Sequence, residues 1–275
     1  MDAGRSRKIV LTGASGTLGR VLAAGLAARY APLVLTDIAA FPDPLPHGAR
    51  FIPADLTDAA VMAELCEGAS AIVHFGGING EKPFETILSG NIVGTHTIFE
   101  AARRNGARVV YASSNHVVGF YPRDARLDIE AAPRPDGLYG VSKVFGEALG
   151  RLMVDRYGLE VVCLRIGSWK QYPTSVRELS TWISPADGVR LIAAALTAPG
   201  VGFAVVYGIS ANTRAWWDLA PARALGYLSV DDAEEYADRI DGADDDPDRS
   251  DPEWARLGGP FAGPAYDEPR LGRED

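Results

Sequence analysis

The sequence predicts an α/β fold: a doubly wound parallel sheet with helices packed on both of its faces. Along the first two-thirds of the chain, short β-branched runs alternate with longer segments that repeat apolar residues at helical spacing. The short runs are apolar without polar alternation, as in strands that are buried on both faces. Strands that alternate with helices are joined by right-handed crossovers and form a parallel sheet.

The elements of this sheet can be placed in order along the chain. Strands are predicted at residues 9–11, 33–35, 50–52, 71–75, 109–112, 160–164 and 204–207. Helices are predicted at residues 17–29, 59–66, 84–104, 138–157 and 185–198. Each helical segment carries its apolar residues on one face, which can cover the sheet.

The chain is long enough for one domain with a substantial core, and we expect a single domain over residues 1–275. Residues 168–184 and roughly 210–275 do not fit the alternating pattern. We expect them to form a small region over the carboxyl edge of the sheet. The acidic segment 241–252 is expected to be a solvated loop of unknown role.

Composition excludes several kinds of protein. A formal net charge of -9 gives no electrostatic footprint for nucleic acid or for an anionic membrane surface. No run reaches the roughly 20 apolar residues of a membrane helix, and the first apolar run is too short for a signal peptide. Because both are lacking, we expect a cytoplasmic location. Cys66 and Cys163 lack metal-ligand spacing, so we expect two buried thiols in a reducing compartment and no metal.

A glycine-rich loop follows the first strand and opens the first helix. It reads Thr-Gly-Ala-Ser-Gly-Thr-Leu-Gly at residues 12–19. Gly13 permits a tight turn, Gly16 allows the backbone to approach a pyrophosphate, and Gly19 allows close packing of helix on sheet. The free N–H groups at the helix start favour phosphate, which predicts a Rossmann-type dinucleotide site. The residues assigned to it here are Gly13, Ser15, Gly16, Thr17, Leu18 and Gly19.

Asp37 ends the second strand, about 18 residues beyond the loop. A carboxylate at this position accepts hydrogen bonds from both hydroxyls of the adenosine ribose and repels a 2′-phosphate. No basic residue follows it closely. The sequence therefore predicts NAD rather than NADP, against the alternative of an Asp that only caps a turn.

The ends of the third and fourth strands complete the predicted cofactor site. Asp55, followed by Leu56, either accepts from the adenine amino group or N-caps the next helix, and the sequence leaves both open. Phe75, Gly76 and Gly77 end the fourth strand, where small residues let a dinucleotide lie across the sheet.

Tyr139 and Lys143 lie one turn apart on the same face of a predicted helix. A phenol is a poor base at neutral pH, but a nearby ammonium favours its phenolate, which can take a proton from a hydroxyl. Tyr and Lys at this spacing are common by chance. The pair gains weight because it follows a strand that ends in Ser113 and Ser114.

These motifs together resemble the extended short-chain dehydrogenase/reductase family. The resemblance rests on the glycine-rich loop, Asp37, Ala-Ser-Ser at 112–114, Tyr139 with Lys143, and Asn91 in an Asn-Ile-Val-Gly-Thr segment. It implies that Ser114 bonds the reacting oxygen and that Lys143 holds the nicotinamide ribose. It also places Asn91 and Ile166 near the cofactor, with a role for Asn91 that is partly structural.

Further segments look like the bacterial uronate dehydrogenases within that family. They are GGINGEKPF (76–84), SSNH (113–116), RPDGLYG (134–140), RIGS (165–168), LSTW (179–182), WW (216–217) and GGPF (258–261). This resemblance implies NAD-dependent oxidation of C1 of a hexuronic acid to an aldarolactone. On this interpretation, residues 1–167 are mainly the dinucleotide-binding core. Residues 168–275 are mainly substrate-binding segments plus the remaining core elements.

The same resemblance implies a set of contacts to the sugar acid. They are Asn79, Ser114, Asn115, His116, Ser168 and Arg177, with Phe261 closing the pocket. Asn79 departs from the family pattern, which often has Ser there and bears on the choice between C4 epimers. Arg177 can grip a carboxylate with two hydrogen bonds, although a surface Arg in a loop is the commoner case. His116 is either a plain hydrogen-bonding residue or a functional one, and Trp216 and Trp217 are expected to pack.

Two other functions stay open at this stage. A nucleotide-sugar epimerase or dehydratase uses the same Tyr and Lys, but the chain has little room for the larger C-terminal domain that holds a nucleotide. A non-catalytic NAD-binding regulator can share the fold. Relatives often assemble through paired helices, so we also expect a homo-oligomer.

Overall fold

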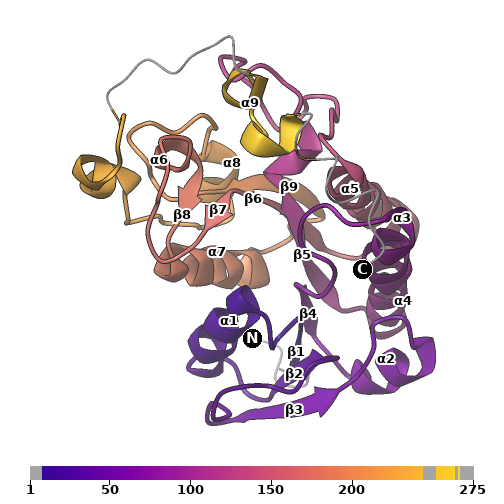
Figure 1. The fold of residues 1–275 in the computed structure, drawn as a ribbon. Coiled ribbons are helices and arrows are strands. Elements are labelled where there is room, and N and C mark those ends of the chain that lie inside the picture. The colour runs from indigo at the N-terminus through magenta and orange to yellow at the C-terminus, as the bar shows by residue number, and fades with distance from the viewer. Residues whose placement is uncertain (1–7, 244–251, 264–265, 267–275) are drawn as a thin grey trace.

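A seven-stranded parallel sheet forms the centre of the computed structural model, which describes residues 8–243, 252–263 and 266 (Figure 1). The strand order is β3-β2-β1-β4-β5-β6-β9. The strands are β1 (Ile9–Thr12), β2 (Leu33–Asp37), β3 (Ala49–Pro53), β4 (Ala71–His74), β5 (Arg108–Ser114), β6 (Val161–Ile166) and β9 (Phe203–Gly208). The predicted doubly wound sheet is confirmed. Most of the acidic segment 241–252 lies outside the described residues.

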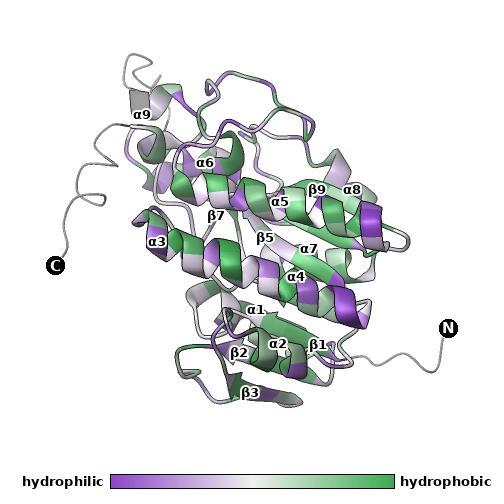
Figure 2. Cartoon of the chain, turned by 90° about the vertical axis from the view of Figure 1, so that its right-hand side faces the viewer, coloured by the Kyte–Doolittle hydropathy of each residue, from purple (hydrophilic) through white to green (hydrophobic). Residues whose placement is uncertain are grey.

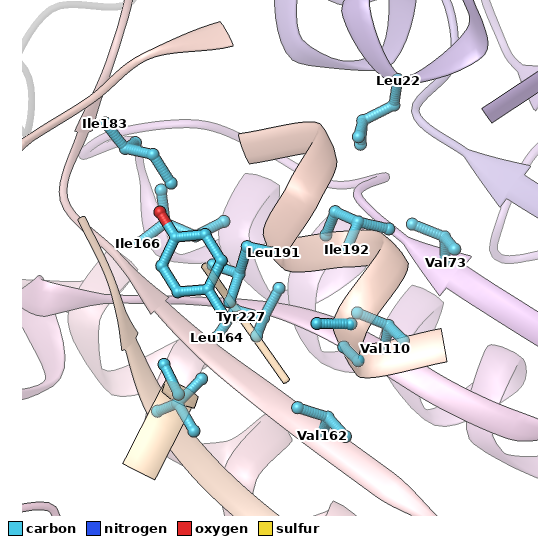
Figure 3. Packing of buried hydrophobic residues seen from close by; sticks show 14 of the residues in the cluster. Leu22, Val73, Val110, Val162, Leu164, Ile166, Ile183, Leu191, Ile192 and Tyr227 are labelled. Carbon is cyan, nitrogen blue, oxygen red and sulfur yellow. The ribbon is translucent and has the colours of Figure 1, made fainter. Parts of the chain in front are cut away.

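Helices cover both faces of the sheet (Figure 1). One face carries α1 (Thr17–Ala27) and α7 (Pro185–Thr197), and the other carries α2 (Ala59–Leu65), α4 (Gly94–Asn105) and α5 (Leu138–Tyr157). Neighbouring strand residues alternate between the two core layers, since Leu11 packs toward α1 and Val10 toward α2. Figure 3 shows the first layer, in which Leu22 and Ile192 meet the sheet side chains.

The predicted helix 84–104 is wrong in one respect, because it is not continuous. The structure has α3 (Phe84–Ile87), a π-helical turn (Leu88–Val93) and then α4. The wider turn accompanies Asn91, a buried polar residue whose side chain bonds outside the helix. Apolar periodicity does not report such an insertion, so the sequence predicted one regular helix.

The segments without regular periodicity form a cover beside the carboxyl ends of β5 and β6 (Figure 1). Their elements are β7 (Ser168–Trp169), α6 (Glu178–Thr181), β8 (Trp182–Ile183), α8 (Ala220–Ala224), the 3-10 helix Ala233–Arg239, α9 (Pro252–Ala255) and the 3-10 turn Gly259–Ala262. Elements this short carry no periodic signal, so the sequence did not predict them.

Asp187 joins this cover to the core. Its side chain lies in the first turn of α7 and is fully buried. The carboxylate accepts from Ser210 Oγ at 2.7 Å, from Ser229 Oγ at 2.8 Å and from the Val230 N–H at 3.0 Å. One carboxylate therefore fixes two segments of the cover against α7.

The aromatic pair near the cover packs as expected. Trp217 is buried and stacks on Tyr207 of β9, with 4.7 Å between ring centroids and 3° between ring planes. Trp216 lies edge-on to Trp217. Of the helices that the structure describes, none combines the length and apolar character needed to cross a membrane.

Candidate active site

A cavity of about 810 Å³ opens at the carboxyl ends of the strands, where the chain order reverses between β1 and β4. Nearly all of the predicted site residues line it. They are Gly13, Gly16, Thr17, Leu18, Gly19, Asp37, Asp55, Leu56, Phe75, Gly76, Gly77, Asn79, Ser114, Asn115, His116, Tyr139, Lys143, Ile166 and Phe261. Ser15, Asn91, Ser168 and Arg177 do not line the cavity and lie behind its wall.

The glycine-rich loop has the geometry that a dinucleotide needs. Gly13 has a φ of 69°, and a Cβ there would lie 2.5 Å from the Phe75 carbonyl oxygen. A Cβ on Gly19 would lie 2.0 Å from the Gly13 carbonyl oxygen. No side chain caps the start of α1 at Gly16, so the first N–H groups of the helix are left for an anion.

Asp37 reaches the same end of the cavity and also holds the loop. Its carboxylate accepts from the Ser15 N–H at 3.0 Å and from the Ala39 N–H at 3.2 Å. The Ser15 hydroxyl donates to the Ala39 carbonyl at 2.8 Å, so Ser15 supports the loop from outside the cavity. The residues at this end fit the adenosine half of NAD.

Asp55 does not N-cap α2, so that alternative is wrong. The cap is Asp58, whose carboxylate accepts from the Ala60 and Val61 N–H groups. Asp55 instead accepts from the backbone N–H and hydroxyl of Thr57, both at 2.8 Å, and these bonds lower the pKa of its carboxyl. The cap lies three positions later than Asp55, because additional turn residues precede α2. Asp55 itself lines the cavity.

Asn91 supports the loop after β4 from outside the cavity. Its Oδ1 accepts from the Ile78 N–H at 2.6 Å, and its Nδ2 donates to the Ile78 carbonyl at 3.1 Å and to Ser142 Oγ at 2.9 Å. A Cβ on Gly77 would lie 2.7 Å from Asn91 Oδ1. The side chain therefore ties the loop after β4 to α5, and its role in this structure is to position both.

Tyr139, Lys143 and Ser114 meet at the other end of the cavity. Burial raises the pKa of Tyr139 to about 12, opposed by a hydrogen bond from Ser114. The Lys143 Nζ lies 5.3 Å from the Tyr139 ring centroid, and burial lowers its pKa to about 8. The expected phenolate is therefore not the form favoured without cofactor, because desolvation outweighs the neighbouring groups.

Glu81 is a site residue that sequence reasoning missed. It is buried in the loop after β4, and its carboxylate accepts from the Leu138 N–H at 2.9 Å and the Tyr139 N–H at 3.0 Å. A Cβ on Gly137 would lie 2.4 Å from Glu81 Oε2, so a side chain there would displace this carboxylate. A carboxylate from a distant loop thus caps the helix that carries Tyr139.

A buried ion pair fixes the middle of the same helix. Arg165 of β6 donates two hydrogen bonds to Glu147 of α5, both at 2.9 Å, and Ser113 donates to Glu147 at 2.6 Å. Glu147 lies one turn beyond Lys143, and Ser113 precedes Ser114. The pair therefore sets the position of α5 relative to β5. This position determines the distance between Lys143 and Ser114.

His116 and Phe261 line the substrate end of the cavity together. Their ring centroids lie 4.1 Å apart, and His116 lies edge-on to Tyr139 at 5.9 Å. His116 Nδ1 lies 2.7 Å from the buried Asp136 carboxylate. Sequence reasoning did not assign Asp136, because nothing in its spacing shows that it faces His116.

Arg177 lies beneath this end and is partly buried, held by contacts to three other segments. Its guanidinium donates to the Leu257 carbonyl at 2.8 and 3.1 Å and to Ser168 Oγ at 3.4 Å. With its amide oxygen turned toward Arg177 Nη2, Asn115 accepts at 2.7 Å and donates to the Ile166 carbonyl at 2.9 Å. Burial lowers the pKa of Arg177 to about 10, against the attraction of the Asp136 and Glu178 carboxylates, neither of which forms a salt bridge with it.

The two thiols are buried, and the described residues hold no metal-binding cluster. Cys66 and Cys163 are buried, and burial raises the pKa of both. Over residues 8–243, 252–263 and 266, no group of three or more His, Cys, Asp or Glu side chains could hold a metal ion.

The buried cation of Lys143 should cost stability. Its folded-state pKa of about 8 lies below the ordinary value of 10.5, so the unfolded chain binds the proton more tightly. We expect Lys143→Met to raise the free energy of unfolding by about 1–3 kcal/mol near neutral pH. The gain should shrink as pH rises from about 8 toward 10.5, because the folded wild type then loses the buried charge.

Urea unfolding of the variant and the wild type, at about pH 7 and about pH 10, measures this difference. Lys82→Met, on an exposed loop residue, is the matched control and should change stability by less than about 0.5 kcal/mol. A Lys143→Met protein no more stable than the wild type at neutral pH would contradict the assignment.

Comparison with known proteins agrees with this geometry. Residues 9–170 match the NAD dependent epimerase/dehydratase family. The uronate dehydrogenase of Pseudomonas putida is 44% identical over 93% of this chain and 95% of its own. The crystal structure of uronate dehydrogenase from Agrobacterium tumefaciens, a tyrosine-to-alanine mutant complexed with NAD, is 43% identical and has a TM-score of 0.87 over 93% of this chain and 97% of its own.

A UDP-galactose 4-epimerase structure shares the fold alone, at 22% identity and a TM-score of 0.60 over 73% of this chain and 76% of its own. The chain therefore belongs to the NAD-dependent epimerase/dehydratase family, and within it to the group that contains the uronate dehydrogenases.

Proposed function

We propose that the protein oxidises C1 of a cyclic hexuronic acid, D-glucuronate or D-galacturonate, with NAD and releases the aldarolactone. The observation that carries this proposal is Arg177, a largely desolvated guanidinium behind Asn115 at the substrate end of the cavity, which the Asp136 and Glu178 carboxylates attract without forming a salt bridge among the described residues. Buried charges in proteins are paired, so this cation favours an anionic ligand. The uronate dehydrogenase relatives support the same substrate class.

The chain provides a distinct place for each part of the cofactor. The loop at Gly13 and Gly16 and the start of α1 would hold the pyrophosphate, and Asp37 would hold the adenosine ribose. Lys143 and Ile166 line the opposite end, where the nicotinamide half fits. When bound, NAD supplies the hydride acceptor and the positive charge of its ring.

Tyr139 is the proposed general base. The C1–H bond breaks with its electron pair, the C1 hydroxyl proton moves to the Tyr139 oxygen, and the C1–oxygen bond becomes a carbonyl within the intact ring. Ser114 bonds the phenol, and the Lys143 ammonium nearby favours its ionised form. Added positive charge is required, because burial alone holds the pKa of the phenol near 12.

The substrate end orients the sugar acid. Arg177 would bind the carboxylate through the donors that it does not use on Leu257, with Ser168 and Asn115 beside it. Asn79 and His116 line the cavity as contacts to the sugar, and Phe261 closes it. Positioning of C1 against Tyr139 follows from holding the carboxylate end.

We also propose that the protein is a homo-oligomer that pairs through the outer face of α4 and α5. Figure 2 shows these helices side by side on one face of the molecule. Val141 and Leu152 of α5 are exposed to 49% and 45%, and Val93, the last residue of the π-helical turn before α4, is exposed to 41%. Sedimentation velocity at micromolar concentration should show a dimer or a larger species, and a monomer would contradict the proposal.

The proposed activity predicts NADH formation. Purified protein with NAD and D-glucuronate or D-galacturonate should give a rise in the NADH absorbance, with much less from D-glucose or with NADP. Tyr139→Phe should lower turnover by at least about 100-fold while the affinity for NAD is kept, because only the proton acceptor is removed.

Tyr157→Phe is the control, since Tyr157 is exposed at the far end of α5. No NADH from either acid, with a measurable affinity for NAD, would overturn the proposal. Epimerised nucleotide sugar as the product would then favour the alternative reaction of the same family.

A further inference from the structure

Asp136 is a buried carboxylate that the chemistry at Tyr139 does not use directly. It lies three residues before Tyr139, and its side chain is 1% exposed. Its Oδ2 lies 2.7 Å from His116 Nδ1. A buried carboxylate that bonds a histidine ring on the cavity wall can set the orientation and the tautomer of that ring.

Two glycines make room for this carboxylate. A Cβ on Gly119 would lie 1.8 Å from Asp136 Oδ2, and a Cβ on Gly258 would lie 2.0 Å from the same atom. Both glycines have right-handed backbones, with φ of -61° and -69°, so any residue could adopt their conformation. Space for the Asp136 carboxylate is therefore what these two positions require.

The two glycines also hold the carboxylate between two parts of the chain. The Gly258 N–H donates to the Gly119 carbonyl at 2.9 Å, which joins the segment before Phe261 to the turn after His116. Phe261 then packs on the His116 ring at 4.1 Å. The ring is thus fixed at Nδ1 by Asp136 and on its face by Phe261.

This arrangement determines which nitrogen of His116 can meet a substrate. An ionised carboxylate only accepts, so the proton of this hydrogen bond belongs to Nδ1. Nε2 has no hydrogen-bond partner within the described part of the chain, and the ring lines the cavity. Nε2 is therefore the atom that faces incoming ligands, and in the neutral ring it carries a lone pair.

We propose that Asp136 is a positioning residue that holds His116 in its Nδ1–H form, so that Nε2 accepts a hydrogen bond from a hydroxyl of the sugar. Its link to catalysis rests on the proposed uronate oxidation. The lone pair on His116 Nε2 repels a carboxylate, whereas Arg177 attracts one. The two residues therefore favour a single orientation of the substrate, with its carboxylate toward Arg177. Asp136 thereby contributes to the single orientation that places C1 at Tyr139.

The tautomer can be observed directly, without turnover. The chain has four histidines, so protein labelled with ¹⁵N-histidine gives few ring signals, and His116→Gln identifies those of His116. The wild type should show a protonated Nδ1 and an unprotonated Nε2 under mildly alkaline conditions. Asp136→Asn should shift the ring toward the Nε2–H form, because the amide can donate to Nδ1. A wild-type ring protonated at Nε2 would overturn the proposal.

The effect on catalysis separates positioning from a general loss of structure. Asp136→Asn should lower kcat/KM for the uronate by about 10- to 100-fold and leave the Kd for NAD unchanged. In a His116→Ala background the same change should add little, because Asp136 acts through the ring. Asp58→Asn, on the exposed cap of α2, is the control and should keep wild-type values.

An equal loss in both backgrounds, or no loss in either, would overturn the role of Asp136. Failure of the wild type to oxidise uronates would instead overturn the proposed function, and the ring spectrum would still decide the tautomer.

Discussion

Arg177 carries a largely desolvated positive charge, and its guanidinium joins Leu257, Ser168 and Asn115 at the substrate end of the cavity. Desolvation of a guanidinium is costly, which is why the pKa of this residue falls to about 10. The Leu257 carbonyl and the Ser168 hydroxyl offset part of this cost with hydrogen bonds but bring no negative charge. The Asp136 and Glu178 carboxylates attract the guanidinium without a direct ion pair, so under the proposed function a substrate carboxylate would complete its neutralisation.

Helix α5, which carries Tyr139 and Lys143, depends on a set of buried carboxylates. Glu81 caps its first N–H groups, and Glu147 pairs with Arg165 farther along. Asp136 lies just before its start and meets His116. Each carboxylate joins α5 to a different part of the molecule. The helix is therefore fixed relative to the sheet, the loop after β4 and the cover. These polar contacts, rather than apolar packing alone, set the positions of Tyr139 and Lys143.

The regular elements and most of the cavity wall could be predicted from the sequence, because both follow from repeating local patterns. Apolar runs predict the strands, and chemistry-bearing residues such as Asp37 and Ser114 end strands whose carboxyl ends meet at one edge. The Asp58 cap, the π-helical turn and the carboxylates of Glu81 and Asp136 could not be predicted. The carboxylates meet partners far away in the sequence, and the cap and the π-helical turn depend on residues inserted locally. No periodicity encodes either.

The most direct measurement of the central role of Arg177 is ligand affinity without turnover. Calorimetric titration of the protein saturated with NADH compares D-glucuronate with D-glucose, which differ in the carboxylate. If Arg177 binds the carboxylate, the acid should bind at least about 10-fold more tightly than the neutral sugar, as expected for a charge-assisted hydrogen bond. Equal affinities for the acid and the neutral sugar would contradict the account.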